Sequence, residues 1–303
     1  MTELIQRPTS GSPGGPSPTV GTILQPVKNR RSRRRKRDFG ALFGIVWIAS
    51  VVLAAIAANV LPLPDPNAVS DSFNAMPAFG PHLLGTDSIG RDVLSRLVFG
   101  ARTSMAVAIG ATTISLVIGV TLGMVAGYFR GRTDSALSLL INFLLSFPPL
   151  IFLIAVVTAL TPGALTLVVA LALLGVPNFA RVARATTIAF ADREFVTAAK
   201  ALGASPARIL VKELLVNVIL PVMSLALVVM ASLVVAEGSL SFLGIGVPPP
   251  TPSWGGMLAA GRESLSEYPQ LVLIPALVFF LTVFSFNRLG DWARGRVGRE
   301  SSL

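Results

Sequence analysis

The sequence contains no cysteine, a single histidine (His82), and only 13% charged residues among its 303 residues. Without cysteine the chain cannot form a disulfide, a thiolate metal site, an iron–sulfur cluster or a cysteine nucleophile. A lone histidine argues against a histidine-built metal site or proton relay. Soluble globular proteins carry about 25% charged residues, whereas this chain has a mean hydropathy of +0.72. The composition indicates a membrane protein.

Charge-free stretches recur along the chain and predict six membrane-spanning helices. About 20 apolar residues cross the hydrocarbon core, and the stretch from 135 to 180 is long enough for two spans joined by a turn at Thr161-Pro162-Gly163. Pro148-Pro149 should break or bend the third span, because proline donates no N–H. The runs are too long for barrel strands. We therefore expect an all-α integral membrane bundle, with spans near 40–61, 104–128, 138–160, 164–180, 215–236 and 270–287.

The basic residues predict the orientation of these spans. Of the 25 Lys and Arg residues, 21 fall on the side that holds both termini, and the other side has only Arg91, Arg96, Arg102 and Arg262. By the positive-inside rule, both termini and the loop 181–213 should face the cytoplasm, and the segments 62–103 and 238–269 should face outward. The run Lys28–Arg37, with eight basic residues in ten, is interpreted as a topogenic anchor that attracts anionic membrane lipid, not nucleic acid.

These patterns divide the chain into four parts. Residues 1–38 should be a disordered N-terminal tail with the polybasic anchor, because their Pro, Gly, Ser and Thr content cannot form a core. Residues 39–103 hold the first span and an extracytoplasmic segment. Residues 104–288 form a five-helix transmembrane core that includes the cytoplasmic loop 181–213, and residues 289–303 form a cytoplasmic C-terminal tail.

Ionisable residues are missing from the interior of the predicted spans, apart from Glu237 at the outer edge of the fifth. Secondary transporters and intramembrane enzymes keep such residues at depth, so the energy source should lie outside this chain. There is no Gly-x-x-x-x-Gly-Lys-Ser/Thr phosphate loop, which argues that the chain does not bind ATP itself. An intramembrane hydrolase would need paired catalytic groups that the sequence lacks. The alternative to a chain that is driven by an outside energy source is a stand-alone secondary transporter or channel.

Three glycines at four-residue spacing, Gly119, Gly123 and Gly127, line one face of the second span and predict close helix packing. Polar residues in or near the spans could line a hydrophilic path or hydrogen-bond between helices, and the sequence does not separate the two. They are Thr112, Thr113, Asn142, Ser146, Asn178, Asn217, Ser224 and Asn287.

The cytoplasmic loop 181–213 has the pattern of two short helices separated by Gly203. Glycine suits the positive φ of a helix C-cap, and Ser205-Pro206 provides a cap residue followed by a proline at the first helical position. We expect a rigid elbow, which could dock into a groove on a soluble partner or lie on the membrane surface.

On the outer side, Asp87, Arg91 and Asp92 are interpreted as a salt-bridge and capping cluster that orders the extracytoplasmic segment. Trp254, after the stiff Pro248-Pro249-Pro250, is expected to be an aromatic anchor at the membrane interface.

The segment Thr197-Ala198-Ala199-Lys200-Ala201-Leu202-Gly203 resembles the "EAA…G" loop by which permease subunits of bacterial ABC importers contact their ATPases. Its surroundings resemble the C-type permease of the dipeptide/oligopeptide/nickel family. Four further segments carry the resemblance: His82–Asp87 with Gly90–Val93, Leu240–Gly244 with Gly246-Val247, Pro249–Gly255 with Met257-Leu258, and Asn287 with Leu289–Asp291. The chain departs from the family pattern where Thr197 replaces a frequent glutamate and where Val216 replaces a usual proline.

The resemblance implies a non-catalytic permease of a type I ABC importer in the bacterial inner membrane, without a cofactor of its own. Its partners would be a homologous permease chain in a heterodimer, two ATPase subunits or domains, and an extracytoplasmic substrate-binding protein. Cargo in the family includes dipeptides, longer peptides, nickel, haem and glutathione. The ATPase contact would fall on Thr197, Ala198, Ala199, Ala201, Leu202, Gly203 and Ala204.

Overall fold

Helices make up nearly all of the computed structural model, which describes residues 39–74, 76 and 82–300. Within these residues there is no β-strand, only the isolated bridges Val69–Arg91 and Thr86–Asp92. The predicted all-α fold is confirmed. The expected N-terminal tail with its polybasic anchor, residues 1–38, and residues 301–303 lie outside the described part of the chain.

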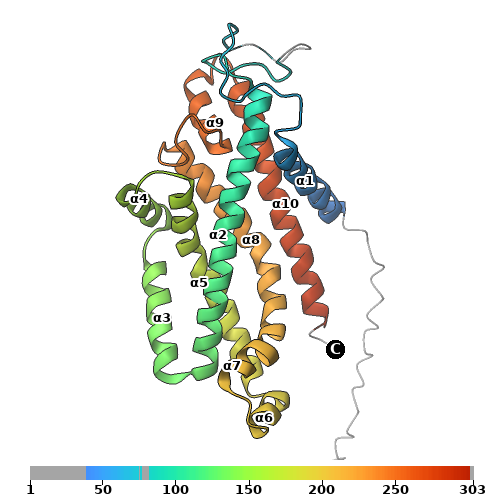
Figure 1. Ribbon diagram of the computed structural model, residues 1–303, viewed down its shortest axis with the longest axis vertical. Coiled ribbons are helices and arrows are strands. Elements are labelled where there is room, and N and C mark those ends of the chain that lie inside the picture. Colours follow the sequence, from blue (N-terminus) through green and yellow to red (C-terminus); the bar gives the residue numbers. More distant parts are fainter. Residues whose placement is uncertain (1–38, 75, 77–81, 301–303) are drawn as a thin grey trace, which may run out of the picture. The chain divides into compact units, whose positions relative to one another are not determined.

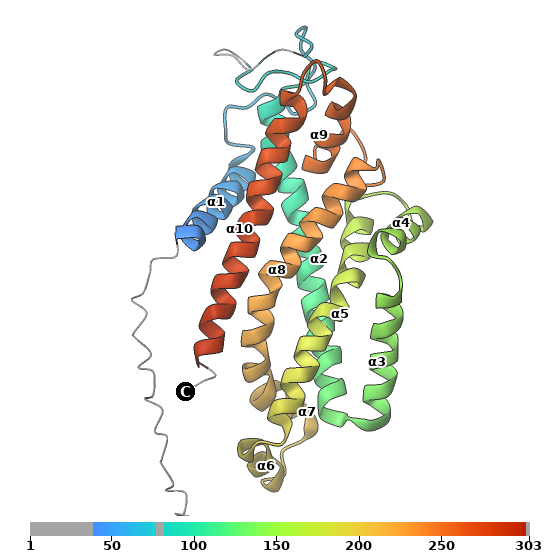
Figure 2. The same ribbon diagram turned by 180° about the vertical axis from the view of Figure 1, so that it is seen from behind.

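Five long apolar helices in the described residues could each cross a membrane (Figures 1 and 2). They are α1 (Phe39–Ala57), α2 (Val93–Phe129), α5 (Ala164–Ala191), α8 (Leu215–Phe242) and α10 (Gln270–Glu300). The π-helical segment η1 (Ile209–Leu214) and the short α7 (Pro206–Arg208) lead without a break into α8. Apart from the bent pair described next, the other helical segments in the described residues are α6 (Glu194–Ala201), α9 (Trp254–Gly261) and the 3₁₀ turn η2 (Arg262–Ser264).

The predicted third span is a bent pair of helices. It consists of α3 (Gly131–Ser146) and α4 (Pro149–Ala159), whose axes differ by 92°. The two prolines account for the break, because neither can donate the N–H that a continuous helix requires. The six predicted spans are obtained only if this bent pair is counted as one of them.

Several helices extend beyond the predicted spans. The second starts at Val93, not at 104, because Asp92 caps it by accepting a hydrogen bond from the Ser95 backbone N at 2.7 Å. The predicted boundary between 103 and 104 therefore lies inside α2. Similarly, α5 continues past 180 to Ala191, and α10 takes up the predicted C-terminal tail as far as Glu300. Charged residues end an apolar run, but they do not end a helix.

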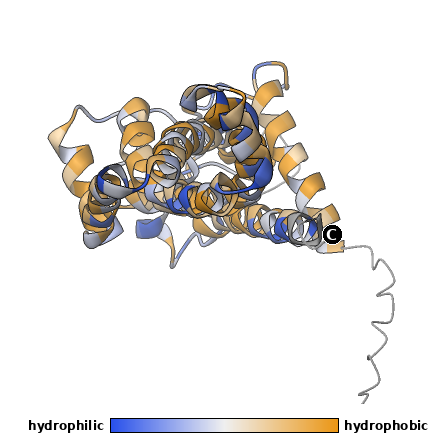
Figure 3. Cartoon of the chain, turned by 90° about the horizontal axis from the view of Figure 1, so that it is seen from below, coloured by the Kyte–Doolittle hydropathy of each residue, from blue (hydrophilic) through white to orange (hydrophobic). Residues whose placement is uncertain are grey.

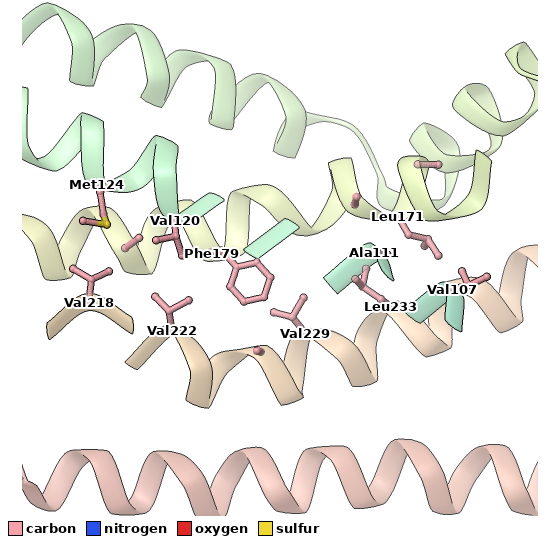
Figure 4. Packing of buried hydrophobic residues seen from close by; sticks show 14 of the residues in the cluster. Val107, Ala111, Val120, Met124, Leu171, Phe179, Val218, Val222, Val229 and Leu233 are labelled. Atoms are coloured by element: carbon pink, nitrogen blue, oxygen red, sulfur yellow. The ribbon is translucent and has the colours of Figure 1, made fainter. Parts of the chain in front are cut away.

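Two clusters of buried side chains hold the bundle together. The first lies between α2, α5 and α8, where Val120, Phe179 and Val222 are buried in the packing shown in Figure 4. The second joins α1, α2, α8, α9 and α10 around Trp254. Many large apolar side chains remain exposed, among them Leu139 and Phe280, and Figure 3 shows that hydrophobic residues make up much of the helices. Such a surface suits lipid or other membrane subunits as its surroundings.

Candidate functional site

The elbow between α5 and α8 has the geometry expected from its sequence around Gly203. Gly203 has φ 77°, its N–H donates to Lys200 O, and the Ala204 N–H donates to Ala199 O, each at 3.0 Å. These two bonds form a Schellman motif that closes α6. Ser205 then caps α7 through a 3.4 Å bond from the Arg208 N–H, and Pro206 occupies the first helical position.

The elbow is shorter than the predicted loop 181–213. Residues 181–191 belong to α5, and residues 206–213 lead into α8, so only 192–205 lie outside the two long helices. The helical pattern of those flanking residues is therefore continuous with the spans. An elbow anchored in this way at both ends has little freedom to move independently of α5 and α8.

The elbow has an inner and an outer face. Val196 is fully buried, and the half-buried Ala199 and Ala204 pack against the first core cluster. The outer face exposes Leu202, with 88% of its side chain accessible. Thr197, Ala198, Ala201 and Gly203 are also exposed. The structure thus presents five of the seven predicted contact residues on one exposed segment, with Ala199 and Ala204 supporting them from beneath.

Charged side chains tie the elbow region to the turn between α2 and α3. That turn passes through two residues with positive φ, Arg130 (51°) and Gly131 (57°). Arg130 Nη2 lies 2.6 Å from the carboxylate of Asp192, the residue that ends α5. On the elbow itself, Lys200 Nζ lies 5.4 Å from the centre of the Tyr128 ring, within the range of a cation–π contact.

A second ion pair fixes the start of α3 to α5. Arg184 donates from Nε to Asp134 Oδ1 at 2.5 Å and from Nη2 to Oδ2 at 2.7 Å. This two-point contact fixes orientation as well as distance. The sequence analysis missed both ion pairs, since their partners lie 50 and 62 positions apart and no local pattern marks them.

The three predicted packing glycines lie against α5. A Cβ on Gly119 would come within 2.8 Å of Val176 O, and one on Gly127 within 2.8 Å of Arg184 O. At Gly123 it would be 2.4 Å from Ala180 O. Because backbone atoms cannot rotate away, only glycine allows the two helices to approach this closely.

The structure also brings the predicted outer residues together. Asp87 accepts hydrogen bonds from the Ile89 and Arg91 backbone N–H groups, and its other oxygen pairs with Arg91 Nε at 2.7 Å. Asp92 caps α2 and pairs with His82 Nδ1 at 2.9 Å. The buried Arg96, which the sequence analysis did not single out, donates to Pro66 O at 3.0 Å.

Trp254 does not sit where the sequence analysis placed it. Its side chain is fully buried, its Nε1–H donates to Leu97 O at 3.1 Å, and its ring meets Phe279 edge-on. The expectation of an exposed interfacial anchor was wrong. The helix carbonyl of Leu97 satisfies the indole N–H inside the protein, so the ring does not need a polar membrane interface.

Glu237 is more enclosed than its predicted place at the outer edge of a span suggested. Helix α8 continues beyond it to Phe242, and the residue is 0% exposed. Its Oε1 accepts a 2.8 Å hydrogen bond from the Ser241 hydroxyl, and Ser104 of α2 lies beside it. The sequence could have predicted this hydrogen bond, because residues four apart in a helix lie on the same face.

The polar residues of the spans separate into three groups, of which Asn217 and Asn287 form the half-buried one. Thr112 and Ser224 are buried, in keeping with a packing role, whereas Thr113, Asn142, Ser146 and Asn178 are exposed. Across the described residues, no group of three or more His, Asp or Glu side chains is arranged to hold a metal ion.

Comparison with known proteins identifies a family of membrane transport proteins that matches this chain. A model for the binding-protein-dependent transport system inner membrane component matches residues 119–299. A dipeptide transport system permease from Alkalihalophilus pseudofirmus is 33% identical, with 96% of this chain and 94% of that protein covered. A glutathione transport system permease from Pectobacterium atrosepticum is 34% identical, with 89% and 93% covered.

Two solved structures share the fold. An inward-facing MetNI methionine ABC transporter matches with a TM-score of 0.53 and 18% identity, over 66% of this chain and 97% of that one. An amino acid ABC transporter with histidines matches with a TM-score of 0.53 and 17% identity, over 67% and 94%. The chain thus has the fold of a type I ABC importer permease, and it belongs to the family of binding-protein-dependent transport system inner membrane components.

Proposed function

We propose that this chain is one of two homologous permease subunits of an ATP-driven importer for peptides or related small solutes. Its match over nearly its whole length to a dipeptide permease and a glutathione permease supports the substrate class. Two ATPase subunits or domains supply the energy, and an extracytoplasmic binding protein delivers the cargo. The chain is a conduit and catalyses no reaction itself.

The distribution of basic residues supports the orientation. The end of the bundle that holds the elbow carries a cluster of basic residues: Arg130, Arg132, Arg181, Arg184, Arg193, Lys200, Arg208 and Lys212. By the positive-inside rule this end lies in the cytoplasm, with both termini. The cluster of Asp87, Arg91 and Asp92 then lies outside, where it gives the binding protein an ordered surface to meet.

The observation that carries the proposal is the elbow. Its outer face presents Leu202 almost fully to solvent, on a segment closed by a Schellman motif and fixed at both ends to long helices. A protruding apolar side chain on a rigid segment suits insertion into a groove on a soluble subunit. When two ATPases close around ATP, the elbow passes that motion to α5 and α8, because the partner binds two states of the elbow differently.

The contact can be tested by cross-linking, since the natural chain has no cysteine. Leu202→Cys should form a disulfide with a cysteine placed in the surface groove of the co-expressed ATPase. Leu53→Cys, on the exposed face of α1, is the matched control and should form none. Equal cross-linking of both variants, or of neither, contradicts the elbow assignment.

Transport is tested with Gly203→Val in vesicles that hold the complete importer. A β-branched residue opposes the positive φ of 77° at this position by about 1–2 kcal/mol, so ATP-driven uptake should be lost while membrane insertion is unchanged. Gly163→Val is the control, because Gly163 has an extended φ of 167° and nothing within 4 Å of its Cβ position. Uptake by vesicles that lack the ATPases would instead support the secondary transporter or channel.

A further inference from the structure

The break between α3 and α4 leaves backbone groups without helical partners. Helix α3 ends at Ser146 and α4 begins at Pro149, with Phe147 extended at ψ 136° between them. The carbonyls of Leu144 and Leu145 would normally accept from the N–H groups four positions later. Those positions are Pro148 and Pro149, which have none.

This break lies at the depth of the hydrocarbon core. The Asp134–Arg184 ion pair places the start of α3 beside the cytoplasmic part of α5. From that level, α3 rises about 18 Å to Ser146, while α5 extends about 30 Å to Ala164, at ~1.5 Å per residue. The break is therefore about 12 Å short of the outer end of α5, inside a hydrocarbon layer of about 30 Å.

Lipid cannot surround such a break. Phe147 is 43% exposed, and both prolines are also exposed on the surface of this chain. Unpaired backbone groups at membrane depth persist only where protein covers them or where they line a water-filled cavity. Asn142 and Ser146 add two exposed polar side chains near the end of α3 to a surface that is otherwise apolar.

An open groove adjoins the break. It has a volume of about 360 Å³, and its walls come from four helices: Leu150 of α4, Val235, Ser239 and Phe242 of α8, Leu258 of α9, and Phe279 of α10. Leu150 stands directly after the two prolines, so the groove begins where the break ends. Its lining is predominantly apolar, and its volume is within the range of small-molecule sites.

We propose that the break and this groove form a subsite of the translocation pathway that takes an apolar side chain of the transported peptide. The inference rests on the proposed peptide import. A peptide has two kinds of group that fit this site, namely hydrogen-bond donors and an apolar side chain. Its N–H groups, including a terminal ammonium, suit the carbonyls at the C-terminal end of α3 that have no N–H four positions later, where the helix dipole is negative. Its apolar side chain suits the groove.

Water access to the break is tested by single-cysteine labelling in the assembled importer. Ser146→Cys should react with a membrane-impermeant cationic thiol reagent, and added Leu-Leu should slow the reaction. Leu53→Cys, exposed on the unbroken helix α1, should stay unlabelled. Failure of Ser146→Cys to react would mean that protein covers the break, and equal labelling of both positions would mean that water access is not specific to it. Either result overturns the proposal.

The ligand class is tested by filling the groove with Val235→Trp. In vesicles with the complete importer and its binding protein, uptake of Leu-Leu relative to Ala-Ala should fall about tenfold, since losing the site for one large apolar side chain costs about one decade of affinity. The control is Val216→Trp, an exposed valine of α8 outside the groove, which should leave the ratio unchanged. An unchanged ratio in Val235→Trp overturns the groove alone. No dipeptide uptake by the wild-type importer overturns the proposed function as well.

Discussion

Replacing Gly123 by alanine should separate α2 from α5 and destabilise the bundle. The added Cβ would lie 2.4 Å from Ala180 O, 2.8 Å from Ala183 Cβ and 2.9 Å from Arg184 N. Two of these three neighbours are backbone atoms of α5, so no side-chain rotation relieves the overlap. The helices must move apart by about 1 Å to restore an ordinary contact of 3.4 Å or more.

The size of the effect follows from the cost of overpacking. Inserting a methyl group into a filled interface costs about 1–3 kcal/mol, and ~1 kcal/mol changes Tm by about 2–4 °C in a chain of roughly this size. We therefore expect Gly123→Ala to lower Tm by about 2–12 °C. Gly110 is the matched control on the same helix, because a Cβ there meets Val168 at an ordinary 3.4 Å. Gly110→Ala should be neutral or stabilising by up to ~1 kcal/mol, since alanine loses less backbone entropy in a helix.

The assay is thermal unfolding of the purified chain in one detergent, with both variants measured side by side. The difference between the two glycine variants is the relevant quantity, because the detergent and the unfolded reference state affect them equally. If Gly123→Ala is as stable as Gly110→Ala, the close α2–α5 contact does not exist in the protein, and the packing role of the glycines is refuted.

Substitutions at three further contacts test the same structure. Asp134→Asn and Arg184→Gln should each cost about 1 kcal/mol of unfolding free energy, and their combination less than the sum, because either one removes the same partly exposed ion pair. Trp254→Phe should cost about 1–3 kcal/mol, since it removes the indole bond to the Leu97 carbonyl and part of the buried ring. Glu237→Ala should cost about 2–3 kcal/mol and Glu237→Gln less than half as much, because glutamine keeps an oxygen that accepts from the buried serine hydroxyl.

Each of these has a control in the chain. The exposed ion pair of Asp291 and Arg294 should be removable with almost no change in Tm, and a loss equal to that of the α3–α5 pair would contradict a special role for the latter. Trp292, on the C-terminal part of α10, is partly exposed and should tolerate phenylalanine. A Glu237→Gln variant as unstable as Glu237→Ala would show that the hydrogen bond does not contribute.

Local chemistry predicted the features that depend on neighbouring residues. The charge-free runs identified the long helices, Pro148-Pro149 identified the break, and Gly203 identified the positive φ of the elbow. Each of these depends on a property of the chain within a few residues: the transfer of apolar groups from water, a missing N–H, or a missing Cβ. The sequence did not predict the 92° angle of the break, since proline interrupts a helix without fixing the direction in which the chain continues.

Local sequence patterns did not predict the contacts between residues that are far apart in the chain. The burial of Trp254 depends on the Leu97 carbonyl, 157 positions away, and the enclosure of Glu237 depends on how far α8 extends. A tryptophan next to prolines fits a membrane interface and a protein interior equally well, until the position of its N–H acceptor is known. The same limit applies to the ion pair of Arg130 with Asp192, whose partners are adjacent only because α2 and α5 are packed side by side.

The glycine contacts and the ion pairs together determine which parts of the chain must move with the elbow. Helix α5 leads directly into the elbow. It is in close contact with the backbone of α2 at Gly119, Gly123 and Gly127, and helices packed this closely must move together. Helix α3 is different, because Ile141 is its one buried residue, and the Arg184–Asp134 bonds join its start to α5. We therefore expect a tilt of α5 to carry α2 with it and to pull α3 through the Arg184–Asp134 bonds, while the break at Phe147 lets α4 keep its contacts with α5 and α8. We propose that the break has a mechanical consequence as well, since one end of the bent pair can follow the elbow while the other end stays beside the groove.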